Sequence, residues 1–582
     1  MNSEKRKKII SERPALNVLN ILLLVGTAVF LLWKCRYGFG NWDESFYLTV
    51  PYRLYQGDAL FADEWHLSQM SSVLLLPFVS AYMAIFKTTA GMILSFRYAY
   101  VAVQTAAAVF IYVKLKKYNI FGAAAASVFF MIYTPFGINA MSYNSLGITC
   151  LTAACVLLCT NEKERRAEWI LCGLFFSAAV LCCPYLAVLY VFFAAAVLIN
   201  YFSDRKKGAS PSSAFSVRCF IWTTAGVLAA AAVFLAFVLS RASVSEIFNA
   251  LPEMLDDPEH ESVGFFEKFK SYFNSIYTIN GSSSKLIYII AGLLLLVVIG
   301  DKDRKKNRKI YLIVFAVVFL PLYYSFVFDK QFINLVMFPL NLLALICFIL
   351  FGENKIISRI FTAVWVPGMI YSFCLHMSSN QLFYAISSAS AVALTGSIVI
   401  ISAAVGTAFE ESPEKSFRII LAAAASVLIA VQAGSEAYLR GTQVFWEDGM
   451  SGQTCMLDGG FEKGLYVTEI KKQRYDEVLE IKKYIDENYG GAKSVLFLSE
   501  NTWLYPVFEN YRNSAYSAWL SGVNDKTVER LMRYYSLRPE KKPDLIYIEA
   551  INAGYSAEFE AGGEYEKEIL GNGNIILSRS IN

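Results

Sequence analysis

Long apolar runs separated by short polar segments fill roughly the first 430 residues of the chain. A helix needs about 20 mostly apolar residues to cross about 30 Å of hydrocarbon. Runs of roughly this length predict about thirteen membrane-spanning helices, an odd number that places the two termini on opposite sides of the membrane. The predicted spans cover residues 18–33, 92–113, 120–135, 146–160, 169–183, 185–202, 219–239, 286–300, 310–328, 332–351, 360–374, 382–404 and 419–432.

Basic residues precede the first predicted span and recur in every second loop, whereas the intervening loops contain few for their length. Short loops rich in lysine and arginine stay in the cytoplasm. The pattern therefore predicts a multi-pass protein of the cell membrane with a cytoplasmic N-terminus. The basic segments are Lys5–Lys8, Lys114–Lys117, Lys163–Arg166, Arg205–Lys207, Lys302–Lys309, Lys355–Arg359 and Lys415–Arg418.

Two further segments of this membrane part lie outside the predicted spans. Ser72–Phe86 is apolar, but it is short and contains Pro77, so we predict a helix at the outer membrane interface. The loop of residues 240–285 contains the acidic stretch Asp256–Glu261. This loop is either a lid over the site or an acidic, solvated linker.

The pattern changes near residue 434, where charge increases and apolar runs shorten. Residues 1–434 therefore form the predicted transmembrane domain, with outer loops 34–91 and 240–285, and residues 435–582 form a small extracytoplasmic α/β domain. Its predicted helices cover 475–488 and 525–535, its buried strands 494–498 and 545–549, and its closing hairpin 566–570 and 574–578.

Composition supports the membrane assignment. The chain is 56% hydrophobic and 17% charged, which is too apolar for a soluble multidomain protein. The net charge of +4 follows from the basic loops and requires no nucleic-acid partner. Most of the eleven cysteines fall inside apolar spans, where a thiol behaves as a small hydrophobic group.

An acidic, aromatic loop follows the first predicted span and contains the adjacent acids Asp43 and Glu44. Charged groups are costly to keep at a membrane surface and are suited to chemistry there. Neighbouring acids cannot share one helix face, so one can reach a cavity while the other meets a cation or solvent. A solvated pair of loop acids is the competing interpretation.

This loop, together with Tyr47, the segment Leu54–Gly57, the acidic-aromatic cluster Asp63–His66 and the interfacial helix, resembles the GT-C superfamily of membrane glycosyltransferases. The similarity is greatest to the protein O-mannosyltransferase and aminoarabinose transferase branch. It covers the membrane part and implies an inverting transferase at the outer face of the cytoplasmic membrane. The implied donor is a sugar on polyprenyl phosphate, and the acceptor is a glycan, protein or lipid.

The resemblance assigns roles to individual residues. Asp43 corresponds to the catalytic base and Glu44 to a supporting acid or metal ligand, with Tyr47 beside them on the substrate side. Lys330 would contact the carrier phosphate, and Arg97 is a second candidate of this kind; the competing interpretation for Lys330 is a snorkelling lysine.

Further polar residues are predicted on the same outer face. Asp63 and Glu64, with His66 nearby on the substrate side, would suit a divalent cation such as Mg or Mn, or they form a polar rim around Trp65. Tyr143 and Asn144 are predicted to line the substrate site, and relatives often carry an acid where this chain has Asn144. A different class, a flippase or transporter of lipid-linked saccharides without chemistry, remains the alternative function.

Overall fold

The computed structural model describes residues 14–40, 43–207, 215–255, 263–278, 284–329, 338–411, 414–444, 447, 449–518, 520 and 522–579. Within these residues, nine helices are long and apolar enough to cross a membrane, and three more apolar helices are shorter. The protein is therefore a polytopic helical membrane protein with a small C-terminal sheet region, as predicted; the count of thirteen spans stays a prediction.

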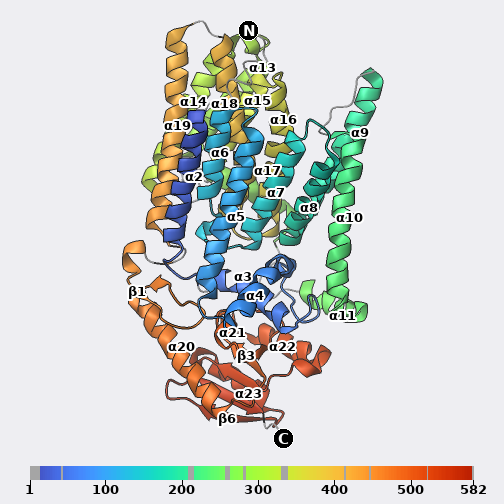
Figure 1. The fold of residues 1–582 in the computed structure, drawn as a ribbon, viewed down its shortest axis with the longest axis vertical. Helices are drawn as coiled ribbons and strands as arrows, with labels where there is room; N and C mark the ends of the chain where they lie inside the picture. The colour runs from blue at the N-terminus through green and yellow to red at the C-terminus, as the bar shows by residue number, and fades with distance from the viewer. Residues whose placement is uncertain are drawn as a thin grey trace.

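Most of the long helices run side by side in one bundle (Figure 1). Their bounds are α2 Pro14–Lys34, α5 Met92–Leu115, α6 Ile120–Ile132, α7 Tyr143–Thr160, α8 Arg166–Cys182, α9 Val188–Lys207, α10 Val217–Leu239, α13 Ser284–Gly300, α14 Arg304–Asp329, α15 Phe338–Phe351, α16 Lys355–Ile360, α17 Val366–Ser378, α18 Leu382–Glu411 and α19 Lys415–Thr442. Four further helices belong to the segments 34–91 and 240–285: α3 Asp43–Gln56, α4 Ser72–Phe86, α11 Val244–Leu255 and α12 Phe265–Thr278.

The helix predicted for the interface is present, with the predicted bounds, as α4. Residues Gln69–Phe86 also satisfy the length and composition of a membrane span. Figure 1 nevertheless draws α4 beside α3, at the end of the bundle that faces the C-terminal region. The helix itself is therefore confirmed, and its place at the membrane interface stays a prediction.

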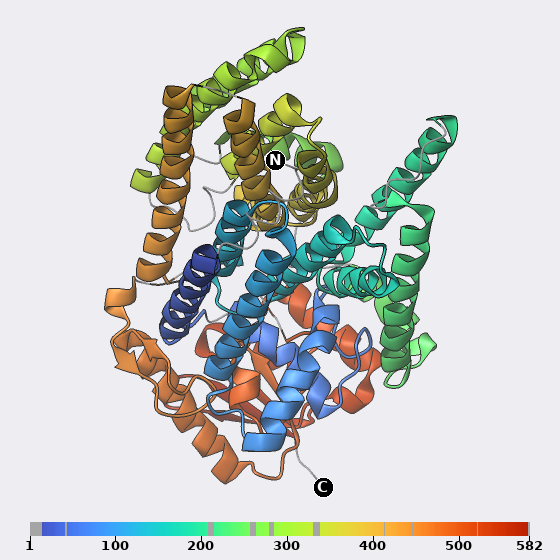
Figure 2. The ribbon, with the colours of Figure 1, turned by 45° about the horizontal axis from the view of Figure 1, so that its top comes forward.

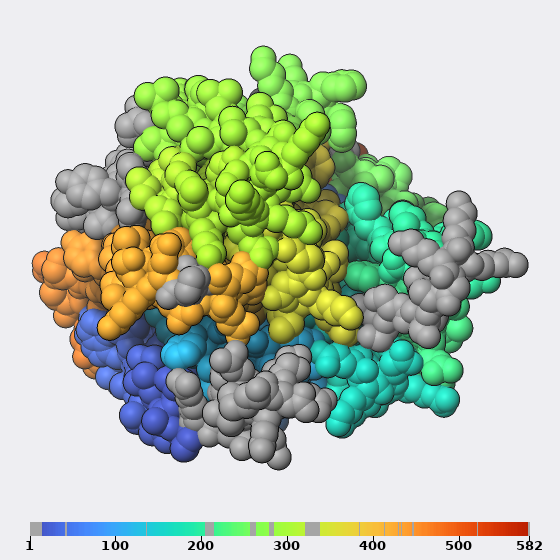
Figure 3. Space-filling view, turned by 90° about the horizontal axis from the view of Figure 1, so that it is seen from above, coloured from blue at the N-terminus to red at the C-terminus, as the bar shows by residue number. Residues whose placement is uncertain are grey.

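Ion pairs join neighbouring predicted basic loops in two separate groups. Arg308 in α14 pairs with Glu353 after α15 at 2.5 Å and with Glu411 at the end of α18. Lys114 at the end of α5 pairs with Glu168 in α8 at 3.1 Å. Figure 3 views the molecule from above, where the yellow-green segment that includes α13 and α14 covers part of the bundle, and Figure 1 places the C-terminal region at the opposite end.

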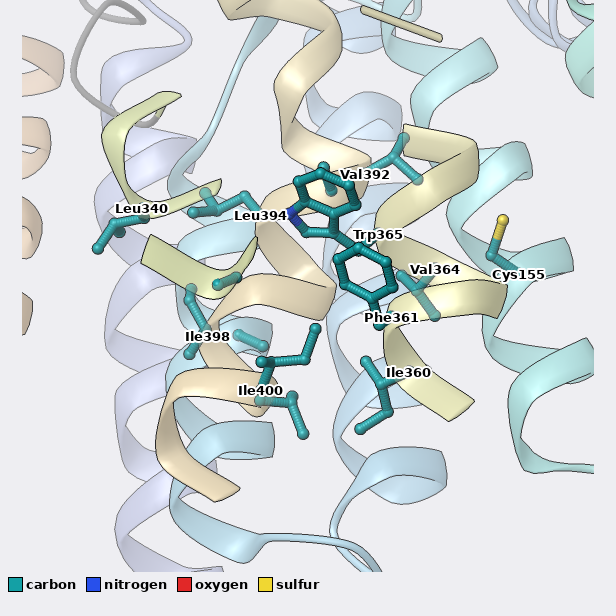
Figure 4. Close-up of a cluster of buried hydrophobic side chains, with 14 of the residues drawn as sticks. Cys155, Leu340, Ile360, Phe361, Val364, Trp365, Val392, Leu394, Ile398 and Ile400 are labelled. Atoms are coloured by element: carbon teal, nitrogen blue, oxygen red, sulfur yellow. The ribbon is translucent and has the colours of Figure 1, made fainter. Parts of the chain in front are cut away.

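The membrane core is closely packed around α15, α17 and α18 (Figure 4). A short π-helix at Phe361–Trp365 joins α16 to α17 and stacks the two rings at its ends, with centroids 4.5 Å apart. Trp365 Nε1 donates to the carbonyl oxygen of Asn341 at 3.0 Å. A side chain at Gly368 would collide with the backbone of Ala393, so glycine allows α17 and α18 to approach this closely.

The C-terminal region contains a five-stranded sheet in the order β4-β3-β5-β7-β6. Strand β3 is parallel to β4 and β5, and the hairpin of β6 and β7 adds antiparallel strands beside β5. The predicted helices, strands and hairpin are confirmed, with small shifts at their ends. The bounds are β3 Ser494–Leu498, β4 Arg512–Asn513, β5 Leu545–Ile548, β6 Tyr565–Ile569, β7 Ile575–Arg579, α20 Glu469–Asn488, α21 Leu504–Val507, α22 Asp525–Leu537 and α23 Ser556–Glu560.

The C-terminal region shares a hydrophobic core with the first outer loop. Buried residues of α3, such as Phe46 and Val50, belong to the same cluster as Phe497 of β3 and Leu531 of α22. Figure 2 shows the C-terminal elements (red) packed against α3 and α4 (blue). Helix α19 also continues past the predicted domain boundary at residue 434 to Thr442. The two predicted domains are therefore joined by extensive packing.

Candidate active site

Asp43 is the first residue of α3, where a negative charge stabilises the N-terminus of the helix. The side chain is half-buried and forms no hydrogen bond or ion pair with any other residue that the structure describes. Burial raises the pKa of the Asp43 carboxyl to about 6 because it disfavours the charged form. A carboxylate that remains unpaired and ionises near neutral pH can accept a proton from a substrate.

The structure brings two of the predicted substrate residues, Tyr47 and Tyr143, close to Asp43. Tyr47 lies one turn further along α3, and its ring meets the ring of Tyr143, at the start of α7, with centroids 5.7 Å apart. Burial and the nearby Asp43 carboxyl raise the pKa of Tyr47, so its hydroxyl stays protonated and can donate a hydrogen bond. The neighbouring Asn144 Oδ1 is buried without a hydrogen-bond partner among the described residues.

A small cavity adjoins these rings. It has a volume of about 10 Å³, room for roughly one water molecule. Residues of α3, of the segment before α4 and of α7 line it: Phe46, Tyr47, Val50, Pro51, Ser68, Gln69, Ser71, Ser72, Leu75 and Tyr143. A saccharide therefore does not fit into this cavity in the conformation observed.

Glu44 points away from Asp43 into a buried ion pair. Arg97 Nε donates to Glu44 Oε1 at 2.5 Å, and Arg97 Nη2 donates to Glu44 Oε2 at 2.6 Å. Arg97 also donates to the carbonyl oxygens of Cys35, at 2.6 Å, and Gly38, at 2.8 Å. The bidentate pair therefore fastens the loop between α2 and α3 to α5. In this conformation the guanidinium of Arg97 donates its hydrogen bonds to other groups of the protein. Its contact with a phosphate stays a prediction.

The C-terminal region contacts α3 next to the acid pair. Ser45 and Thr502, which follows β3, are joined by a hydrogen bond between their hydroxyl groups. The Thr49 hydroxyl, one turn along α3, donates to the carbonyl oxygen of Thr502 at 3.2 Å. Helix α3 is thus held by α5 on one side and by the C-terminal sheet on the other, which fixes the direction of Asp43.

Asp63 and Glu64 lie in a buried network of charges, away from Asp43. Arg53 Nη1 donates to Glu64 Oε2 at 2.6 Å, and Arg53 Nε donates to Asp58 Oδ2 at 2.7 Å. Asp63 pairs with two cations of the C-terminal region, Arg538 and Lys541, at 2.9 and 3.3 Å.

These ion pairs involve the two carboxylates, Asp63 and Glu64, that were predicted to bind a metal ion. The described residues contain no group of three or more carboxylate, histidine or cysteine side chains that could hold a metal ion. Because cations already neutralise Asp63 and Glu64, this arrangement does not suit Mg or Mn. We therefore derive no catalytic step through a metal ion. His66 packs its ring against Phe46, with centroids 4.6 Å apart, and its Nδ1 is 2.8 Å from the Ser68 hydroxyl.

One predicted phosphate ligand, Lys330, lies outside the described residues. Two buried charged residues of α19, Glu436 and Arg440, were not predicted from the sequence. Arg440 donates to Asn139 Oδ1 at 2.7 Å and to the Thr134 hydroxyl, so α19 is joined to the connection between α6 and α7. The sequence signal for these two residues is a glutamate four residues before an arginine, because residues at this spacing lie on one face of a helix.

A large apolar cavity opens among the membrane helices. Its volume is about 380 Å³. Residues of α7, α8, α9, α10 and α17 line it, including Leu151, Phe176, Phe193, Ala196, Val366 and Ile370. A cavity with this lining suits a hydrocarbon chain.

Comparison with known proteins adds no assignment. No protein-family model matches the chain, and no curated protein sequence matches it.

Proposed function

We propose that this protein is a membrane glycosyltransferase that moves a sugar from a polyprenyl-phosphate donor to an acceptor at the outer face of the cytoplasmic membrane. The observation that carries the proposal is Asp43, a half-buried carboxylate with no ion-pair partner among the described residues and a pKa raised to about 6. The two tyrosine rings beside it supply hydroxyl groups near the same position. The resemblance of the acidic loop to the GT-C superfamily gives the reaction class.

In the proposed reaction, the Asp43 carboxylate takes the proton of the acceptor hydroxyl. The acceptor oxygen then bonds to the anomeric carbon from the face opposite the carrier. The bond between that carbon and the phosphate oxygen breaks, and polyprenyl phosphate leaves with the electron pair. Attack from the opposite face inverts the anomeric centre. In this proposal Tyr47 donates a hydrogen bond to the sugar, and Lys330 contacts the leaving phosphate.

The apolar cavity supports a lipid-linked donor, because it offers the carrier chain a site among the helices. We further propose thirteen membrane crossings, with the N-terminus in the cytoplasm and the C-terminal region outside. The ion pairs that join neighbouring basic loops support this orientation. The C-terminal region then lies on the same side as Asp43.

The alternative is a transporter that moves a lipid-linked saccharide and leaves its bonds intact. Such a protein also needs an apolar cavity, so the cavity favours neither function. Transfer chemistry is favoured by the Asp43 carboxyl, which has no partner within the described part of the chain, because transport alone does not require such a group.

Reconstituted protein distinguishes the two functions. The full chain in lipid vesicles is given radiolabelled polyprenyl-phosphate monosaccharides and an envelope extract as the source of acceptor. We expect the label to leave the carrier and polyprenyl phosphate to be released. Label that crosses the bilayer while still attached to its carrier would support the transporter. Mass analysis of envelope glycans from cells with and without the gene then identifies the sugar and the acceptor together.

The pH dependence of transfer provides a first prediction. Asp43 accepts a proton only when it is ionised, so kcat/KM should fall below about pH 6, by roughly tenfold per pH unit. Activity is expected to be retained above this value. The measurement is initial rates across a pH series, with circular dichroism at each pH as the control for folding. A profile that stays flat to about pH 4.5 would contradict a base with a pKa raised by burial.

The apolar cavity provides a second prediction. Ala196 lines the cavity, whereas Ala195 beside it on α9 is exposed at the protein surface. Ala196→Trp should raise KM for a long-chain donor by about tenfold, the loss of roughly two buried methylene groups. The same substitution at Ala195 is the control and should leave KM unchanged. Equal KM values for both variants would show that the donor chain binds elsewhere.

A further inference from the structure

The loop of residues 240–285, predicted as a lid or an acidic linker, contains two amphipathic helices, α11 and α12. In α11 the large apolar residues Val244, Phe248, Leu251 and Leu255 recur at intervals of four, three and four residues, which places them on one face. All four are exposed, and Phe248 is 67% exposed. A stripe of this kind on a protein surface indicates an interaction site.

The remaining faces of α11 attach the helix to the protein. Ala250 and Met254 are buried. Glu253 pairs with Arg533 of α22 at 2.9 Å, and Glu246 pairs with Arg538 of the C-terminal region. These contacts fix the rotation of α11, so its apolar stripe is held outward while its acids are neutralised.

Helix α12 also has an exposed apolar stripe and is attached to the protein by other contacts. Phe265, Phe266, Phe269 and Phe273 form an exposed apolar stripe, and Phe273 is 56% exposed. Tyr272 borders this stripe and packs against Phe373 of α17, with ring centroids 5.1 Å apart, and the ring of Phe269 also lies 6.2 Å from that of Phe373. Lys268 Nζ donates to the carbonyl oxygen of Ser379 at 2.6 Å, just after the end of α17. Helix α12 is therefore fixed at the end of α17 that is remote from the basic loops.

The α11 stripe continues the lipid-facing surface of α10. The last turns of α10 expose Val233, Leu235 and Leu239, as expected for a helix that faces hydrocarbon. Helix α11 begins a few residues later, and Figure 1 places it at the end of α10 beside the C-terminal region. The apolar surface thus extends from a membrane helix to the level of the C-terminal region.

We propose that α11 and α12 lie in the membrane interface, with both apolar stripes inserted at the boundary between lipid headgroups and acyl chains. The partner is the lipid surface of the leaflet next to the C-terminal region. Because α11 carries Glu246 and Glu253, which pair with that region, lipid contact at α11 sets the height of the C-terminal sheet above the membrane. This inference does not depend on the proposed transfer reaction.

Adjacent residues on each helix provide a matched test. Phe248 and Asn249 of α11, and Phe273 and Asn274 of α12, are all exposed, but each phenylalanine lies on the apolar stripe and each asparagine on the polar side. Each is replaced singly by cysteine and spin-labelled in the full chain, in nanodiscs of phosphatidylcholine and phosphatidylglycerol. The partly exposed native residues Cys150, Cys374 and Cys455 are first replaced by alanine.

We expect labels at Phe248→Cys and Phe273→Cys to collide more often with oxygen than with a water-soluble nickel chelate. Labels at Asn249→Cys and Asn274→Cys should instead collide more often with the nickel chelate than with oxygen. The logarithm of the ratio of the two collision rates therefore changes sign between neighbouring positions. Preferential collision with the nickel chelate at both phenylalanine positions would overturn the proposal, because the stripes would then face water. Protection from both reagents there would also overturn it, since a protein partner, such as a second copy, would then cover the stripes.

Discussion

Replacement of Asp43 by asparagine should reduce kcat for sugar transfer by about 10²- to 10⁴-fold, with little change in donor KM. The amide has nearly the same size, but it cannot accept the proton of the acceptor hydroxyl. Because Asp43 has no ion-pair partner among the described residues, its replacement should cost only its modest interaction with the N-terminus of α3 and lower the melting temperature little. Initial rates and thermal unfolding in the same detergent measure both effects.

Two variants serve as controls for this experiment. Asp458→Asn makes the same chemical change at an exposed position of the C-terminal region and should leave kcat unchanged. Glu44→Gln removes the adjacent acid and should lower the melting temperature, because it leaves the buried Arg97 charge without its partner. If Asp43→Asn retained most of the wild-type kcat, Asp43 would not be the base and the proposed transfer mechanism would be wrong.

The largest effect on stability is expected for Arg97→Gln. Removing one partner of a buried ion pair leaves an uncompensated charge and typically costs about 3–5 kcal/mol. Here the substitution also removes the hydrogen bonds of Arg97 to the carbonyl oxygens of Cys35 and Gly38. The melting temperature should therefore fall markedly, as measured by thermal unfolding of the purified protein.

A double-mutant cycle separates the structural role of Arg97 from phosphate binding. Arg97→Gln combined with Glu44→Gln removes both charges, so the double variant should be less unstable than the sum of the two single variants. If Arg97 instead contacts the donor phosphate, Arg97→Gln should weaken donor binding while the melting temperature remains that of the wild type. That second result would contradict the structural role inferred from the ion pair.

The apolar runs of the sequence were sufficient to identify a polytopic membrane protein, because the length of an apolar run is a local property that a helix preserves. The same holds for the C-terminal hairpin, whose strands 566–570 and 574–578 flank the turn Gly571–Gly573 and pair as predicted. Asp43 was also singled out from sequence, because it is an acid in the loop after the first span, and its role as the base stays a prediction.

Only the tertiary structure decided how the charges of the outer loop are paired. Glu44 and Asp43 are adjacent acids in the same loop, so the local sequence does not distinguish them. In the structure, Arg97 of α5 binds Glu44, whereas Asp43 has no ion-pair partner among the described residues. Asp63 similarly meets Arg538 and Lys541, which lie far away in the sequence. Hydrophobic periodicity records the environment of each residue, whereas the partner of a buried charge depends on which distant elements pack against it.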